Sequence, residues 1–154
     1  MEIKTGNIWD AWEDADLFLL AAHSTVKSGK LVMAGNGLEE AQRRFPKLSE
    51  ALGQAILRKA DRTVPNGLEY YLLVSDRWPA AKLGLLQTRY TVLESHNEFI
   101  AMPSLLDLVL WTIDHQDAEI HVEADPVLVA MFQGTLKNIP RVTLWVNEVV
   151  GEQR

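Results

Sequence analysis

The strongest constraint on the fold is a set of short apolar runs in which polar and apolar residues do not alternate. The run Leu17–Ala22 contains only apolar residues. Strands that are buried on both faces have this pattern, whereas a strand with one solvated face alternates apolar and polar side chains. Similar runs predict strands at 70–75, 83–90, 119–123 and 142–146, and a short strand at 1–4 would extend the set.

Helical periodicity fills the intervals between these runs. Apolar residues recur three or four positions apart in 38–45, from 48 onward, in 102–115 and in 126–138, although 106–113 fits a strand as well. Pro46 and Pro140 follow two of these helices, Pro103 is expected in the first turn of another, and Ser49 is expected near a helix cap. The order of elements predicts an α/β protein, a three-layer α/β/α sandwich with a mixed, mostly parallel sheet.

Composition limits the class of protein. The chain has 154 residues, 47% of them hydrophobic and 23% charged, which is typical of a single globular domain spanning 1–154. A net charge of −6 argues against a nucleic-acid partner, whose binding needs a basic surface, but it allows an anionic small ligand held by backbone amides. The absence of cysteine excludes thiolate catalysis, disulfides and iron–sulfur ligation.

The spacing of the four histidines predicts no metal site, and the apolar segments predict no membrane span. The histidines lack metal-ligand spacing, so neither a metal site nor a cofactor is expected, and His121, between two apolar strand residues, is predicted to be structural. No segment reaches the roughly eighteen apolar residues of a membrane span. The first residues show no secretory signal, so we expect no membrane association and a cytoplasmic location.

Two polar loops are candidates for a ligand site. Gly35, Asn36 and Gly37 follow the strand at 17–22 and precede a helix, whose N-terminal N–H groups favour phosphate. The spacing is neither that of a P-loop nor that of a dinucleotide fingerprint, and an ordinary strand-to-helix turn explains it equally well. Asn7 follows the short first strand and offers a donor and an acceptor to a base edge, although a simple turn is an alternative there.

Taken together, these motifs resemble the macro domain superfamily. The resemblance rests on Gly6-Asn7-Ile8, on the stretch 25–33, on Arg43-Arg44-Phe45-Pro46 and on residues 74–79. It is closest to the small macro-domain-like proteins of bacteria and phages. It extends over residues 1–90 by motif and over the remainder only in the order of elements. It implies a ligand of the ADP-ribose type, lying across the carboxyl edge of the sheet.

The resemblance also implies roles for individual residues. Asn7 and Ile8 would face the adenine, Ala34 to Gly37 would line the diphosphate and the distal ribose, and His23 and Ser24 stand where many members have an asparagine. The implied ligand-binding residues are Asn7, Ile8, Ser24, Ala34, Gly35, Asn36, Gly37 and Asp125, with His23 as the candidate catalytic residue.

The sequence departs from the family pattern at two places. A neutral imidazole at His23 does not reproduce the donor-and-acceptor pattern of an amide. The second glycine-rich phosphate loop is missing, and Glu123 and Asp125 occupy its place. Because carboxylates repel a diphosphate, we expect binding to be micromolar at best and to improve when Asp125 is neutralised.

The sequence and its resemblance leave three functions to compare. The first is binding of ADP-ribose or a related derivative, with hydrolysis of an ADP-ribosyl or terminal phosphate bond if His23 acts as general base. The alternative is a degenerate macro fold that serves as a protein-interaction or assembly module without a small ligand. An unrelated α/β hydrolase is disfavoured because the chain has no Gly-x-Ser-x-Gly nucleophile elbow.

Overall fold

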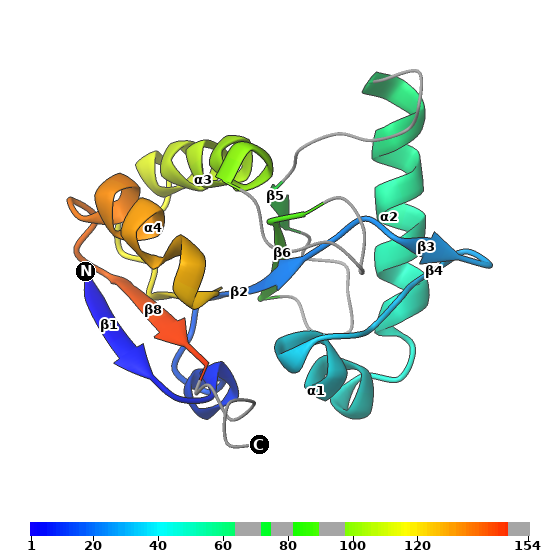
Figure 1. Cartoon of the computed structure of the whole chain (residues 1–154), viewed down its shortest axis with the longest axis horizontal. Coiled ribbons are helices and arrows are strands. Elements are labelled where there is room, and N and C mark those ends of the chain that lie inside the picture. Colours follow the sequence, from blue (N-terminus) through cyan, green and yellow to red (C-terminus); the bar gives the residue numbers. More distant parts are fainter. Residues whose placement is uncertain (64–71, 75–81, 90–97, 148–154) are drawn as a thin grey trace.

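A computed structural model describes residues 1–63, 72–74, 82–89 and 98–147, and a six-stranded sheet forms its centre (Figure 1). The strand order is β1-β8-β7-β2-β6-β5. The strands are β1 (Glu2–Thr5), β2 (Leu17–Ala22), β5 (Leu72–Val74), β6 (Leu83–Gln87), β7 (Ile120–Ala124) and β8 (Val142–Val146). All neighbours are parallel except β5, which runs antiparallel to β6, so the predicted mixed, mostly parallel sheet is confirmed.

Helices cover both faces of this sheet. Figure 1 shows α1 (Asn36–Arg44) and α2 (Leu48–Thr63) on one side and α3 (Glu98–Ile113) and α4 (Val129–Leu136) on the other. Two short 3-10 helices, η1 (Ile8–Ala11) and η2 (Pro126–Leu128), precede β2 and α4 respectively. Separate cores lie on the two faces, one with residues of η1, α1 and α2 and one with residues of α3 and α4. The predicted three-layer arrangement is therefore confirmed.

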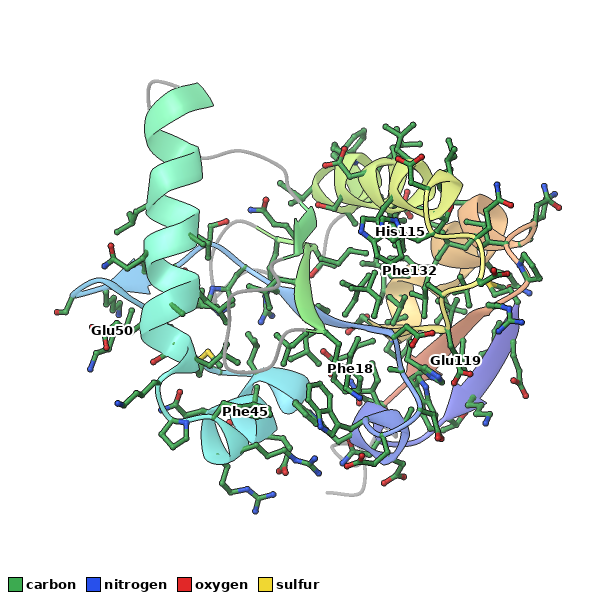
Figure 2. All side chains as sticks on the ribbon, turned by 180° about the vertical axis from the view of Figure 1, so that it is seen from behind. Phe18, Phe45, Glu50, His115, Glu119 and Phe132 are labelled. Atoms are coloured by element: carbon green, nitrogen blue, oxygen red, sulfur yellow. The ribbon has the colours of Figure 1, made fainter. Side chains whose placement is uncertain are left out.

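Strand β2 shows why its sequence is a continuous apolar run. Leu17 and Leu19 belong to the core beneath α3 and α4, whereas Phe18 and Leu20 belong to the core beneath α1 and α2. Each of these side chains is at most 1% exposed. Figure 2 labels one aromatic residue of each core, Phe18 and Phe132. Because the strand lies between β7 and β6 and both faces are covered, five of its six residues are buried and Ala21 is half-buried.

Helix boundaries differ from the sequence prediction where tertiary packing extends or shortens a helix. Helix α3 begins at Glu98, so Pro103 lies inside it and not in its first turn. Ala101 is buried, and its burial favours the earlier start in spite of the proline. Ser49 is the second residue of α2 and is buried, so it is not the cap. The predicted helix 126–138 divides into η2 and α4.

A hairpin that the sequence analysis treats as loop projects beside α2. Strands β3 (Val26–Lys27) and β4 (Lys30–Leu31) pair antiparallel. Their turn residues Ser28 and Gly29 both have positive φ, 54° and 77°, which matches a two-residue hairpin turn. The Ser-Gly pair between two short segments is the signal that could have predicted it. Predicted strand residues 70, 71, 75 and 90 and motif residues 75–79 lie outside the described residues.

No helix in the described part of the chain is both long and apolar enough to cross a membrane.

Candidate functional site

Polar residues gather at the carboxyl edge of the sheet. Asn7 lies just after β1, Asn147 after β8, Asp125 after β7, His23 after β2 and Arg89 after β6. These five strands run parallel, so the loops that follow them meet at one edge, which is where open α/β sheets bind ligands. Helix α1 begins at the same edge.

A cleft of about 780 Å³ opens at this edge beside β1, β8 and α1. Its volume lies within the ordinary range of small-molecule sites. The lining is mostly polar and includes carboxylates, amides and one guanidinium, contributed by Thr5, Gly6, Asn7, Asp10, Glu39, Glu40, Arg43 and Asn147. Of the residues that the sequence predicts for ligand binding, Asn7 lines this cleft.

The structure separates the two residues that were predicted to face a base. Asn7 is exposed, and its Oδ1 accepts a hydrogen bond from the Trp9 backbone N–H at 3.0 Å, which caps η1. Ile8 is 1% exposed and packs in the core with Phe18. Any contact of Ile8 with a ligand therefore comes from its backbone and not from its side chain.

Glu123 is buried at the N-terminus of α1. Its Oε1 accepts from the Ala21 N–H at 3.1 Å, its Oε2 accepts from Asn147 Nδ2 at 3.3 Å, and the Gly37 N–H also donates to the carboxylate. Burial raises the pKa of Glu123, while these hydrogen bonds and the charge of Arg89 act in the opposite direction. The carboxylate joins the ends of β2 and β8 to the start of α1.

Gly37 has a structural role as well as its predicted position at the site. A Cβ at Gly37 would lie 2.6 Å from Leu20 Cδ2 and 2.7 Å from Glu123 Oε1. Its carbonyl accepts a hydrogen bond from Trp9 Nε1 at 3.1 Å. Because the Gly37 N–H donates to Glu123, it is engaged within the protein, which corrects the expectation that this N–H points at a phosphate.

Gly35 keeps the features expected of an anion contact. It is exposed, has φ of +110° and precedes Asn36, the first residue of α1. A Cβ at Gly35 would lie 3.6 Å from Arg89 Nη2, so the glycine backbone lies close to a guanidinium. Ala34, half-buried, leads into this turn.

Arg89 is the functional candidate that the sequence analysis missed. Burial lowers its pKa, whereas the charges of Glu123 and Asp125 raise it. The two carboxylates therefore have a cation beside them. This corrects the expectation that Glu123 and Asp125 present uncompensated negative charge to a diphosphate. Asp125 also caps η2 through Oδ1, which accepts from the Val127 N–H at 2.9 Å. Arg89 belongs to no motif, and its only sequence signal is its place just after an apolar run.

His23 and Ser24 directly follow β2 and are not among the residues that line the cleft. The His23 ring is fully buried, and its Nδ1 accepts from the Thr25 N–H at 3.0 Å, which places the proton of the neutral ring on Nε2. Burial and the nearby Arg89 lower the pKa of His23 to about 4, so the ring is neutral at pH 7. Ser24 Oγ accepts from Gln87 Nε2 at 2.5 Å.

His121 lies away from this edge and is a structural residue, as predicted. Trp145 Nε1 donates to its Nδ1 at 2.8 Å, and its Nε2 lies 2.8 Å from Glu119 Oε2. An indole N–H is a donor only, so the His121 ring carries its proton on Nε2 and donates to Glu119. Among the described residues, no group of three or more histidines and carboxylates has the geometry of a metal site.

Comparison with known proteins identifies the fold. No family model and no curated protein matches the sequence. Among solved structures, the macrodomain of Thermus aquaticus DarG superposes with a TM-score of 0.70 at 18% identity, over 96% of this chain and 97% of that one. The macrodomain of Mycobacterium tuberculosis DarG gives a TM-score of 0.65 at 14% identity, over 95% of each chain. The chain has the macrodomain fold.

A third match comes from a longer protein. Thermosipho africanus DarTG in complex with ADP-ribose aligns with the whole of this chain, at a TM-score of 0.68 and 12% identity. The alignment covers 43% of the DarTG chain, so the present chain spans less than half of that protein's length. The fold-level resemblance that the sequence motifs indicated is confirmed by these neighbours.

Proposed function

We propose that this macrodomain binds ADP-ribose or a related ADP-ribose derivative at the carboxyl edge of its sheet. The observation that carries the proposal is the polar cleft beside β1, β8 and α1, on the same edge as the exposed Gly35 backbone and Arg89. The proposal is supported by the shared fold of a protein solved in complex with ADP-ribose.

The polar groups at this edge fit the nucleoside and the diphosphate parts of such a ligand. Asn7 and Asn147 line the cleft with amide groups, which can recognise a base or a ribose by hydrogen bonds. We assign the diphosphate to Gly35 and Arg89, because an open glycine backbone and a guanidinium attract phosphate. Glu39 and Glu40 also line the cleft; Glu40 is ion-paired with Arg43 and Arg44, so the charge of Glu39 is the one that opposes an anion there, and we expect micromolar affinity.

We propose that His23 is not the general base in any hydrolysis at this edge of the sheet. A general base must reach the proton that it removes, and the His23 ring is fully buried. With a pKa of about 4 it is also a weak base at neutral pH. We infer that His23 positions the loop after β2, through its hydrogen bond from the Thr25 N–H. Incubation with an ADP-ribosylated peptide and with an ADP-ribose phosphate measures hydrolysis directly.

Calorimetric titration with ADP-ribose tests the binding proposal. We expect Arg89→Gln to weaken binding about tenfold, since it removes a charge-assisted contact. Arg141→Gln is the matched control, because it removes the same charge from an exposed residue that precedes β8, at the opposite edge of the sheet. It should leave the affinity unchanged within about twofold, as expected for a distant, screened charge.

The same titration decides between the two functions. A ligand that binds only the folded protein must raise its melting temperature. If the wild-type macrodomain shows neither heat nor a thermal shift at millimolar ADP-ribose, the binding proposal is wrong. The protein-interaction module without a small ligand then becomes the better explanation.

A further inference from the structure

The outer surface of α3 carries exposed apolar side chains that are not part of the hydrophobic core. Phe99 is 85% exposed, Leu106 51%, Leu110 62% and Ile113 59%, and we call these four residues the α3 stripe. The opposite side of the same helix already fills the core, and its Leu105 and Leu108 are fully buried, among others. Figure 2 shows side chains of α3 pointing outward from the molecule. The outer side of α3 therefore exposes apolar area in addition to the apolar residues that fill the core.

The spacing of the stripe is that of a helix-pairing surface. Phe99, Leu106 and Ile113 recur every seven residues, and Leu110 falls between the last two. With Pro103, the intervals along the helix alternate between four and three, which is the a and d pattern of a helix pair. A row of this spacing forms one narrow strip on an α-helix, and exposed apolar strips mark interaction sites.

Charged residues beside the stripe are all acidic. Glu98, Asp107 and Asp114 are exposed, and the stretch 98–117 contains no lysine or arginine. Asp107 precedes Leu110 by three positions and Asp114 follows it by four, so both carboxylates lie next to the stripe on the helix surface. Such a surface attracts a basic partner and repels an anionic lipid surface or another acidic one.

We propose that the α3 stripe docks an amphipathic helix of a partner protein, with an apolar seam flanked by lysine or arginine. This inference goes beyond ADP-ribose binding, because α3 covers the face of the sheet opposite to α1 (Figure 1). The two sites are therefore tested separately.

A second copy of the chain fits this surface poorly. Two α3 helices would bring Asp107 and Asp114 of both copies together, and the like charges would repel. The helix has 16 residues, hence is about 24 Å long and about 10 Å wide. One such face offers a few hundred Å² to either occupant, well below the roughly 800 Å² per partner of a stable dimer, so the area allows a transient complex with a partner helix and disfavours a stable homodimer.

A synthetic helical peptide tests the proposal on the whole chain. The probe is about three heptads long, with leucine at a and d and lysine at e and g, and carries a fluorophore for anisotropy measurements. We expect the double variant Leu106→Ser with Leu110→Ser to bind it at least tenfold more weakly than the wild type. The matched control is Leu57→Ser with Val127→Ser, which removes two exposed apolar residues outside α3 and should bind like the wild type.

A second arm tests the charges. Asp107→Asn with Asp114→Asn should weaken the peptide severalfold and flatten its salt dependence, since both carboxylates are then neutral. A peptide with glutamate at e and g should bind the wild type at least tenfold more weakly.

Three outcomes would overturn the proposal. The first is equal peptide affinity of the wild type and the stripe variant, at unchanged melting temperature and ADP-ribose affinity. The second is an equal loss in the control double variant, which would show non-specific binding. The third is a wild-type dimer in sedimentation that the stripe variant abolishes, since a second copy would then be the occupant.

Discussion

At the scale of single residues, the absence of a side chain at Gly37 allows close packing at the carboxyl edge of the sheet. Its position brings the backbone of α1 against Leu20 and the Glu123 carboxylate. We predict that Gly37→Ala lowers the free energy of unfolding by about 2 kcal/mol, because a Cβ there overlaps Leu20 and Glu123 in a packed core. Urea denaturation measures the change.

Gly134 provides the control for this prediction. It lies in α4, and a Cβ there meets nothing within 4 Å. Since alanine favours a helix over glycine, Gly134→Ala should raise the free energy of unfolding by about 0.5–1 kcal/mol. If both variants lose stability equally, the contacts of Gly37 are not the cause.

His23 predicts a pH dependence of stability with a definite sign. The pKa of His23 is about 4 in the folded chain, against an ordinary value of 6.5, so between these values the unfolded chain holds a proton that the folded chain lacks. Stability from His23 is therefore fully present above pH 6.5 and is lost as the pH falls toward 4. The difference between these two pKa values corresponds to a change in the free energy of unfolding on the order of 3 kcal/mol.

The variant His23→Asn isolates this contribution. It removes the titrating ring, so the wild type should lose more stability than the variant between pH 7 and pH 5 in urea denaturation. Glu123 has a raised pKa and acts in the opposite direction, but it is present in both proteins and cancels in the comparison. Identical pH dependence of the two proteins would contradict the assignment.

At the scale of elements, the hairpin β3-β4 is attached to α2 through Gly53. A Cβ at Gly53 would lie 2.3 Å from Gly29 O and 2.9 Å from Lys30 Cα, and backbone atoms cannot turn aside as a side chain does. We predict that Gly53→Ala displaces the hairpin and costs about 2–3 kcal/mol of stability. Hydrogen exchange should speed up at 26–31 much more than in β2. Uniformly faster exchange would instead indicate a global effect.

The elements also show where sequence patterns are sufficient. The bounds of Leu17–Ala22 and Val142–Val146 agree with the prediction, because burial on both faces favours apolar residues, and Thr143 is the one polar residue in these two strands. The early start of α3 and the place of Ser49 inside α2 were not predicted. Both depend on side chains such as Ala101 being buried against another element, which local pattern does not encode.

At the scale of the whole molecule, the balance of charge at the carboxyl edge sets the affinity for an anion. Asp125 adds a negative charge near Arg89 and also caps η2 through Oδ1. Asparagine keeps that acceptor, so Asp125→Asn should preserve the fold and bind ADP-ribose severalfold more tightly. Calorimetry at low and high salt checks this, and the gain should shrink at high salt. An unchanged affinity at low salt would place Asp125 outside the reach of the ligand's charge.

The sequence by itself determined the layers of this protein and the edge at which its candidate site lies. Apolar runs and helical spacing are local patterns, and they are sufficient to set the order of strands and helices. Asn7 and Gly35 were found because each lies next to such an element, and Asp125 because it stands where the resembled family has its second phosphate loop.

Only the tertiary structure decided what these residues do. It buries the Ile8 side chain, places the Glu123 carboxylate against the Gly37 backbone and brings Arg89 close to Glu123 and Gly35, from segments far apart in the chain. Burial and neighbouring charge depend on the surroundings of a side chain, so they set the pKa of His23 and of Glu123 only once the elements have packed.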